Sequence, residues 1–245
     1  MHRSAPTAMR RTSWLGGDSM EGSAMNEIAM MTRREASRAL LAGAALVVAP
    51  GLTAAQDLQL PPPATDGGKP LMQALRARRS IREYANRPLP LPLLSGLLWA
   101  AFGINRPASG DRTAPSWRHF IAIDIYAALS DGVWRYDPKA HRLLLQVPGD
   151  LRALTGTQDF VGAAPLNLVY VADQTRMGGA APDDQRLYAF TDTGFIGQNV
   201  HLFCASEGLA TVFRGSVDRE KLARNMRLGA SQFITFAQSV GYPIG

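Results

Sequence analysis

The sequence has little of several features that define common classes of protein. It contains one cysteine and four scattered histidines among 245 residues, so no disulfide can form within the chain and no metal-ligand spacing is visible. Cys204 lies in an apolar stretch, which indicates a buried structural thiol rather than a nucleophile. Charged residues make up 19% of the chain and form no basic run with interleaved aromatic residues, so nothing indicates a nucleic-acid surface.

A long hydrophobic run is also missing. The apolar run Ala39–Val48 is too short to cross a bilayer comfortably. It follows the paired arginines of Thr32–Ser37 and precedes small residues that end at Ala55, which is typical of a twin-arginine export signal. We therefore expect residues 1–55 to be a signal peptide, with a start codon placed too early, cleavage near Ala55, use of the twin-arginine export machinery and a periplasmic location. An uncleaved membrane anchor is the alternative.

The composition divides the chain after this leader into two parts. Residues 56–69 are rich in Pro and Gly and predict a linker, whereas residues 70–245 suit one domain. The leader carries six arginines and four acidic residues, so its removal lowers the net charge from +6 to +4. This mild excess favours anionic small ligands at most.

The apolar periodicities predict an α+β domain, with helices around a mainly antiparallel sheet. The expected helices are Leu71–Arg79, Leu91–Phe102, a short one from Asp150, Gln185–Ser206 and Asp218–Met226. The expected strands are Phe120–Tyr126, Val133–Tyr136, Leu143–Val147, Asn167–Ala172, Leu209–Arg214 and Phe233–Val240, and Gly103–Ser116 is expected to be irregular.

The basic stretch Leu75–Tyr84 is the most informative motif. On an extended backbone Arg78, Ser80 and Arg82 share one face, where two guanidiniums flank a hydroxyl group. Arginine suits phosphate because its planar fork binds two oxygens at once and never loses its charge. The alternative is a solvated basic helix end that the helix dipole favours.

This stretch, read with later motifs, resembles the start of a nitroreductase-family flavoprotein. The resemblance covers about residues 70–243 and includes Arg112–Ser116, Ile123–Tyr126, Ala153–Gln158, Asp192–Val200, Glu207–Thr211, Arg214–Gly215 and Val240–Pro243. It is nearest to a branch that includes azoline-type dehydrogenases. It implies a nitroreductase-like fold in which the long, largely apolar helix lies at the centre of an intimate homodimer. A helix buried within a monomer is the alternative.

The resemblance also implies a bound FMN in clefts to which both subunits contribute. The residues expected to hold it are Arg78, Arg79, Ser80, Arg82, Pro115, Ser116, His119, Arg214 and Gly215. Gly215 matches the position whose backbone N–H approaches the flavin N5, where a missing Cβ leaves room for a flat ring. Arg214 would add positive charge near the reduced flavin.

Two positions depart from the family pattern. His119 stands where the family has an asparagine that hydrogen-bonds the flavin pyrimidine, and it is also a candidate acid–base group. The last strand lacks the basic residue that often precedes its apolar run, which here begins at Phe233. One partner of the FMN phosphate is therefore expected to be missing.

The implied activity is that of an FMN-dependent oxidoreductase. Hydride or electrons would pass in two steps through flavin N5, to or from a small organic substrate such as a nitro compound or a quinone. A small-molecule donor and a small-molecule acceptor are the expected partners. No protein nucleophile is required, and no nucleophile elbow surrounds Ser116. The alternative is a degenerate member without tightly bound flavin that acts as a non-catalytic small-molecule binding protein.

Overall fold

The computed structural model describes residues 57–244, so the expected signal peptide and its cleavage site lie outside the described residues. A seven-stranded sheet has the order β1-β6-β5-β4-β7-β9-β8, and β2 and β3 form a separate two-stranded sheet. The strands are β1 (Asp57–Gln59), β2 (Ile104–Arg106), β3 (Asp111–Arg112), β4 (Ile123–Ala128), β5 (Gly132–Asp137), β6 (Arg142–Pro148), β7 (Leu166–Asp173), β8 (Ala210–Arg214) and β9 (Gln232–Gly241). The α-helices are α2 (Leu71–Ala77), α3 (Leu91–Phe102), α4 (Pro182–Glu207) and α5 (Arg219–Asn225), and the 3-10 turns are η1 (Trp117–His119), η2 (Arg152–Thr155), η3 (Asp159–Val161) and η4 (Gln174–Arg176).

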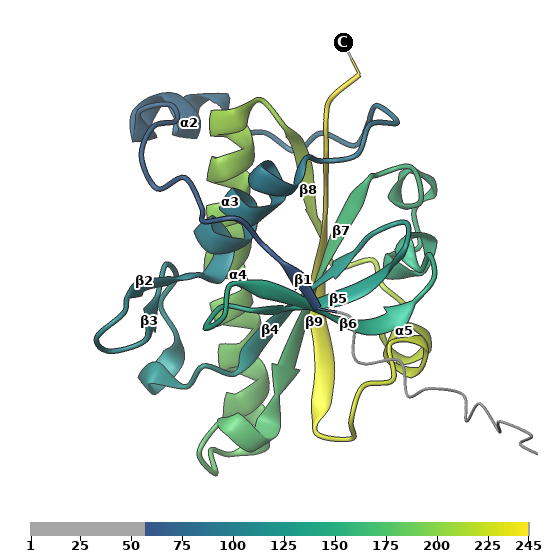
Figure 1. Cartoon of the computed structure of the whole chain (residues 1–245). Coiled ribbons are helices and arrows are strands. Elements are labelled where there is room, and N and C mark those ends of the chain that lie inside the picture. The colour runs from purple at the N-terminus through teal and green to yellow at the C-terminus, as the bar shows by residue number, and fades with distance from the viewer. Residues whose placement is uncertain (1–56, 245) are drawn as a thin grey trace, which may run out of the picture. The chain divides into compact units, whose positions relative to one another are not determined.

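Helices cover both faces of the large sheet. Figure 1 shows α2, α3 and α4 on one side of it and α5 on the other. Strand β7 lies between them, and all its residues from Leu166 to Ala172 are buried, as expected for a strand that is covered on both faces. Every paired strand is antiparallel to its neighbour. The α+β fold with a mainly antiparallel sheet is therefore confirmed.

Three helices differ in length from their sequence-based bounds, and α5 is shorter by one residue at each end. Helix α2 ends at Ala77 rather than Arg79, because Arg78 already has an extended backbone at φ −57° and ψ 122°. Helix α4 begins three residues earlier than expected, since Pro182 fits the first turn. It ends before Gly208, whose φ of 71° is the left-handed conformation that terminates many helices.

Residues 57–69, which the composition suggested to be a linker, are docked on the domain, and we call them the strap. Their first residues form β1, which pairs with β6, and Leu60 is only 2% exposed. At the other end, Lys69 donates its backbone N–H to Ser206 Oγ at 2.8 Å and its ammonium to Ala205 O at 3.0 Å. The expectation of a free linker is therefore corrected, because the backbone groups of β6 give the strap partners that its composition does not reveal.

A partly buried hydrogen-bond relay fixes the middle of the strap. Ser95 Oγ donates to Pro61 O at 2.6 Å and lies 2.7 Å from His141 Nε2, while Tyr136 OH lies 2.9 Å from His141 Nδ1. Because the single Ser95 proton goes to Pro61, His141 must donate to Ser95 and accept from Tyr136. Burial lowers the pKa of His141, which favours the neutral ring that this relay needs. The relay is therefore structural.

Residues 57–244 contain neither a membrane-spanning helix nor a metal-binding cluster. Every helix among residues 57–244 is too short or too polar to span a bilayer. No group of three or more His, Cys, Asp or Glu side chains in the same range could hold a metal ion. Cys204 is fully buried on α4, and burial raises the pKa of its thiol, so the expectation of a buried structural thiol is confirmed.

Candidate functional site

The Arg78–Arg82 segment runs extended beside β8. Arg78 N–H still bonds the last turn of α2 through Ala74 O at 2.8 Å, and Ile81 N–H donates to Thr211 O of β8 at 2.9 Å. The Ile81 side chain packs against a small buried cluster that includes Tyr84. The apolar residues of this stretch thus anchor it, and its arginines are left at the surface.

The arginines of this segment have no anionic partner among residues 57–244. Arg79 and Arg82 are exposed and Arg78 is half-buried. Within residues 57–244, the ion pairs of 4 Å or less include none of the three. Ser80, also exposed, lies between them in the chain. Several unpaired guanidiniums beside a hydroxyl group can bind an anion.

His201 of α4 faces this segment and was missed in the sequence. It is 7% exposed, and its Nδ1 atom is buried without a hydrogen-bond partner among the described residues. Burial, with a smaller effect from the charge of Arg78, lowers the pKa of His201 to about 4. The ring is therefore neutral at physiological pH and leaves the local positive charge to the arginines.

Arg214 lies inside the domain rather than at its surface. It is 3% exposed, and its guanidinium donates to Ser239 Oγ at 3.2 Å, to Thr155 O at 3.0 Å and to Asn167 Oδ1 at 3.0 Å. Burial lowers its pKa to about 10, so it stays charged at neutral pH, and no carboxylate of residues 57–244 forms an ion pair with it. Any influence of Arg214 on a ligand near Gly215 therefore acts through space or through the backbone.

We expect Gly156→Ala to destabilise the protein, because a Cβ at Gly156 would collide with Nη1 of Arg214. Crowding of this kind costs about 1–3 kcal/mol in the free energy of unfolding. Urea denaturation measures it. Gly162→Ala is the matched control, since its added Cβ would lie 3.4 Å from the nearest atom. Equal stability of the two variants would contradict the close packing around Arg214.

Gly215 follows β8 and is exposed, beside an aromatic cluster. A Cβ added to Gly215 would meet only the ring of Phe236, at 3.5 Å, so packing within the chain does not require glycine here. Phe236 contacts Phe213 and Phe190, with ring centroids 4.6 and 5.2 Å apart. The bare backbone at Gly215 is thus open to a ligand and has a partly buried aromatic wall next to it.

The Pro115–His119 loop is held at a different level of α4. Trp117 N–H donates to both carboxylate oxygens of Asp192, at 3.1 and 3.2 Å. The Trp117 ring stacks on Tyr188, with centroids 4.0 Å apart and planes 5° from parallel. Positive φ values of 50° and 59° at Arg118 and His119 are strained for non-glycine residues, and such strain persists only where the surroundings fix it.

The end of this loop points outward. The His119 side chain is 88% exposed, and its Nδ1 lies 3.6 Å from Asp111 Oδ1. Pro115 is exposed and Ser116 half-buried. No hydrogen bond joins these three side chains to the Arg78–Arg82 segment among the described residues. Within one chain, the loop therefore presents its predicted site residues to solvent.

Asp192 is a buried carboxylate that the sequence did not single out. It is 3% exposed, and burial raises its pKa to about 6, against the opposing effect of the Trp117 N–H. Near neutral pH it therefore carries an incompletely compensated charge. In the structure, Asp192 holds the strained loop by accepting hydrogen bonds from Trp117 N–H.

The pH dependence of stability tests this burial. The folded protein holds the Asp192 proton up to about pH 6, whereas the unfolded chain releases it near pH 4. The contribution of the protonated group is therefore present at low pH and lost as pH rises through 6. We therefore expect the wild type to lose stability relative to Asp192→Asn as pH rises. The free energy of unfolding of the wild type minus that of the variant should fall by about 1 kcal/mol from pH 5 to pH 7.

Urea denaturation at both pH values measures this difference. The subtraction removes titrations common to both proteins, including that of His201. Asparagine keeps an oxygen that accepts from Trp117, so the loop contact survives the change. A difference that does not vary with pH would show that Asp192 ionises normally.

The predicted site residues form two groups in a single chain. The Arg78–Arg82 segment adjoins β8 and His201, whereas the Pro115–His119 loop adjoins Asp192. His201 follows Asp192 by nine residues, which corresponds to about 13.5 Å along the helix axis. Within one chain, the Arg78–Arg82 segment therefore lies near the strand that leads to Gly215. The Pro115–His119 loop of the same chain does not join them.

Comparisons with known proteins agree with this fold. The nitroreductase family model matches residues 75–242. A protein assigned as a nitroreductase in Methanocaldococcus jannaschii is 35% identical over 156 residues, which are 60% of this chain and 78% of that protein. A crystal structure from Ralstonia eutropha JMP134, also assigned as a nitroreductase, has 44% identity and a TM-score of 0.75 over 77% of this chain and 90% of that one.

A more distant structure shares the fold alone. The NADPH:FMN oxidoreductase of Vibrio harveyi, solved with NAD⁺, is 20% identical, with a TM-score of 0.53 over 71% of this chain and 69% of that one. The family match spans most of the sequence and nearly all of the sheet. The chain therefore belongs to the nitroreductase family of oxidoreductases.

Proposed function

We propose that this protein is an FMN-dependent oxidoreductase that acts on a small organic substrate such as a nitro compound or a quinone. The observation that carries the proposal is the extended Arg78–Arg82 segment, whose three arginines have no carboxylate partner within residues 57–244 and lie beside the strand that ends at Arg214. Unpaired guanidiniums fit a phosphate. The FMN oxidoreductase named among the structures of the same fold supports the choice of flavin.

The residues of this chain fit the proposed cofactor. Arg78 and Arg82 would bind its anionic and polar oxygens, with Arg79 and Ser80 between them. The exposed backbone of Gly215 has open space on the side away from Phe236, which suits a flat ring. Bound FMN would supply the hydride and electron chemistry, so the protein has only to bind, orient and shield the reactants.

The competing function is a small-molecule binding protein without tightly held flavin. It is favoured by the start of β9, where Gln232 and Phe233 stand in place of a cation, and by the outward direction of His119. The guanidiniums of Arg186 and Arg219 there lie over aromatic rings, Arg186 over Phe190 and Phe233 and Arg219 over Phe190. Flavin content separates the two functions.

We also propose a homodimer that completes the site. Helix α4 buries one face against the sheet, but Leu187 and Phe195 on its other face are 59% and 46% exposed. Neighbouring α2, which contacts α4, exposes Leu71 and Met72 at 62% and 70%. An apolar surface shared by two helices is typical of a subunit interface.

A two-fold axis would join the two groups of site residues. Phe195 and Gln198, both exposed, lie near the midpoint between Asp192 and His201. If two α4 helices pack antiparallel about that midpoint, the loop held by Asp192 in one subunit comes level with His201 in the other. A symmetric interface would thus produce two complete sites. The separation within one chain supports this arrangement.

The location and the electron donor are proposed from the sequence. Export by the twin-arginine route would place the protein in the periplasm, and the leader that supports it lies outside the described residues. NAD(P)H is scarce there, so a quinone-linked or protein donor is an alternative. Cell fractionation with and without the twin-arginine machinery tests the location.

The visible absorption spectrum of the purified full-length protein tests the main proposal. We expect flavin bands after expression with riboflavin available, or after addition of FMN and desalting, and their bleaching by a reductant. A protein that stays colourless after both treatments would favour the flavin-free binding protein instead.

A further inference from the structure

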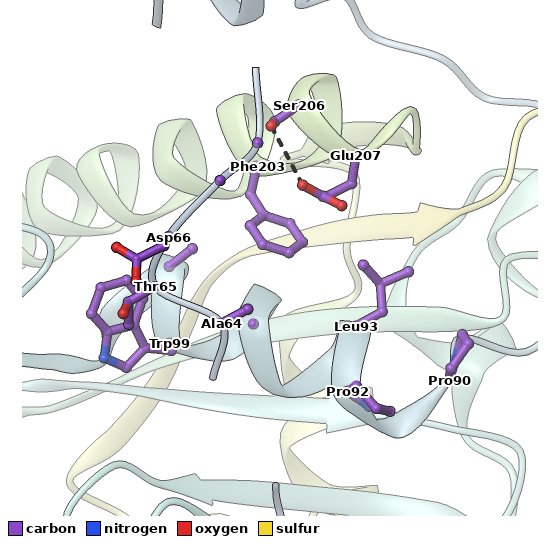
Figure 2. Close-up of a pocket in the computed structure, with 14 residues that line it drawn as sticks. Ala64, Thr65, Asp66, Pro90, Pro92, Leu93, Trp99, Phe203, Ser206 and Glu207 are labelled. Carbon is purple, nitrogen blue, oxygen red and sulfur yellow. Dashed lines mark hydrogen bonds between the residues drawn. The ribbon is translucent and has the colours of Figure 1, made fainter. Parts of the chain in front are cut away.

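A cavity of about 560 Å³ lies between the strap, α3 and the end of α4. Figure 2 shows it with the strap on one side and the two helices around it. None of its lining residues belongs to the proposed flavin site. Its volume is within the range of small-molecule sites, which is about 300–1,000 Å³. It therefore needs an explanation of its own.

The cavity has an aromatic and apolar interior. Trp99 of α3 and Phe203 of α4 supply rings, and Pro90 and Leu93 extend the apolar wall. Figure 2 shows the Phe203 ring pointing from α4 into the space above α3. A Cβ at Gly96 would lie 3.2 Å from Phe203 Cζ, so glycine leaves space for this ring. Such walls suit the body of an apolar ligand.

The charges around the cavity are negative. Asp66 of the strap and Glu207 of α4 line it, and no basic residue does. Neither carboxylate has a basic partner within 4 Å among residues 57–244. The C-terminal end of α4 adds partial negative charge. Lys69 is the nearest cation along the strap, and its ammonium is already bound to Ala205 O.

The strap wall is closely fitted. Gly68 has a left-handed φ of 76°, and a Cβ there would lie 2.6 Å from Ser206 Oγ. The next residue bonds the same hydroxyl through its backbone. With Pro61 fixed by Ser95, the strap is held on both sides of the stretch that contains Asp66. The negative wall therefore has a defined position.

We propose that this cavity binds a small organic cation that carries an aromatic or aliphatic body, with its ammonium group attracted by the carboxylates of Asp66 and Glu207 that line the cavity. The rings of Trp99 and Phe203 would contact the body and attract the cation through their faces. This site goes beyond the proposed flavin chemistry and does not depend on it.

Isothermal titration calorimetry of the full-length protein with benzyltrimethylammonium tests the proposal. Benzyl alcohol and benzoate are the neutral and anionic probes of similar size. We expect the cation to bind at least about tenfold more tightly than either, because cation–π attraction and two carboxylates favour it alone. Added salt should weaken this binding.

The double variant Asp66→Asn/Glu207→Gln keeps the shape of the cavity and removes its charge. We expect it to lose about tenfold in affinity for the cation while its affinity for benzyl alcohol is unchanged. Asp159→Asn/Glu220→Gln, at exposed positions elsewhere, is the matched control. Both carboxylates of the cavity are exposed, so the fold is expected to survive, as circular dichroism would verify.

Three results would overturn the proposal: no binding of the cation, equal binding of the cation and benzyl alcohol, or an unchanged affinity in the double variant. The salt dependence of the wild type gives a reading that needs no variant. Flavin content is measured on the same samples. A protein without flavin that still binds the cation would refute the oxidoreductase proposal alone, and a yellow protein that ignores the cation would refute this one alone.

Discussion

The double variant Arg78→Ala/Arg82→Ala is expected to fold normally and to lose its bound flavin. The segment is held in place by Ile81 and its backbone hydrogen bond to Thr211 O, not by the two arginine side chains, so their removal should leave the fold intact. Each charge-assisted hydrogen bond to a phosphate contributes about 1.5–3 kcal/mol. Loss of two should therefore weaken FMN binding roughly a hundredfold or more. Fluorescence titration of the apoprotein with FMN measures the dissociation constant.

A matched control uses two exposed arginines outside the segment. Arg76→Ala/Arg224→Ala removes two positive charges from helix ends and so has the same effect on net charge. We expect this variant to bind FMN as the wild type does. Equal losses in both double variants would mean that general charge, not the segment, attracts the flavin. An unchanged affinity in Arg78→Ala/Arg82→Ala would remove the site from this segment.

The substitution Phe195→Asp is expected to convert a dimer into monomers and to weaken flavin binding. Phe195 lies on the outer face of α4 near the proposed two-fold axis, so each subunit would place its new carboxylate close to its counterpart. Burying these two like charges would cost several kcal/mol. Light scattering after size exclusion measures the molar mass, and flavin retention is read from the same peak.

The molar mass reports on the dimer interface, and flavin retention reports on the binding site. Ala230→Asp adds a carboxylate to an exposed position before β9 and should leave both mass and flavin unchanged. If Phe195→Asp stays dimeric, the α4 face is not the interface. If it becomes monomeric and still retains FMN with wild-type affinity, one chain suffices for binding and the composite site is wrong.

Local sequence patterns predicted most of the framework. The continuous apolar run of β7 and the long helix α4 were expected from residue order alone, because strands and helices with strong patterns are set largely by local chemistry. The end of α2 was not. Arg78 is a good helix former, and only the pairing of Ile81 with β8 shows why the chain leaves the helix at Ala77.

The site was predicted less completely than the framework. The cationic segment could be recognised from the sequence because Arg78, Ser80 and Arg82 alternate and so share one face of an extended backbone. Asp192 and His201 were not, since a polar residue on a helix shows no sign of burial until its neighbours are known. Arg214 was expected near a ligand, but its side chain lies on the other side of the strand from the Phe213 ring, which packs at Gly197 of α4. The burial of Asp192, His201 and Arg214 depends on packing between segments that are distant in the sequence.

The strap determines which cleavage of the N-terminal residues the large sheet would tolerate. Without β1, strand β6 would be an outermost strand whose free backbone groups could recruit a strand from another molecule and start aggregation. Cleavage near Ala55 would leave Asp57–Gln59 intact, whereas removal of residues up to the start of the family match at residue 75 would uncover β6 and take Leu60 out of the core. If the proposed leader is removed, the position of the cut would therefore decide whether the remaining chain keeps the strand that shields β6 from other molecules.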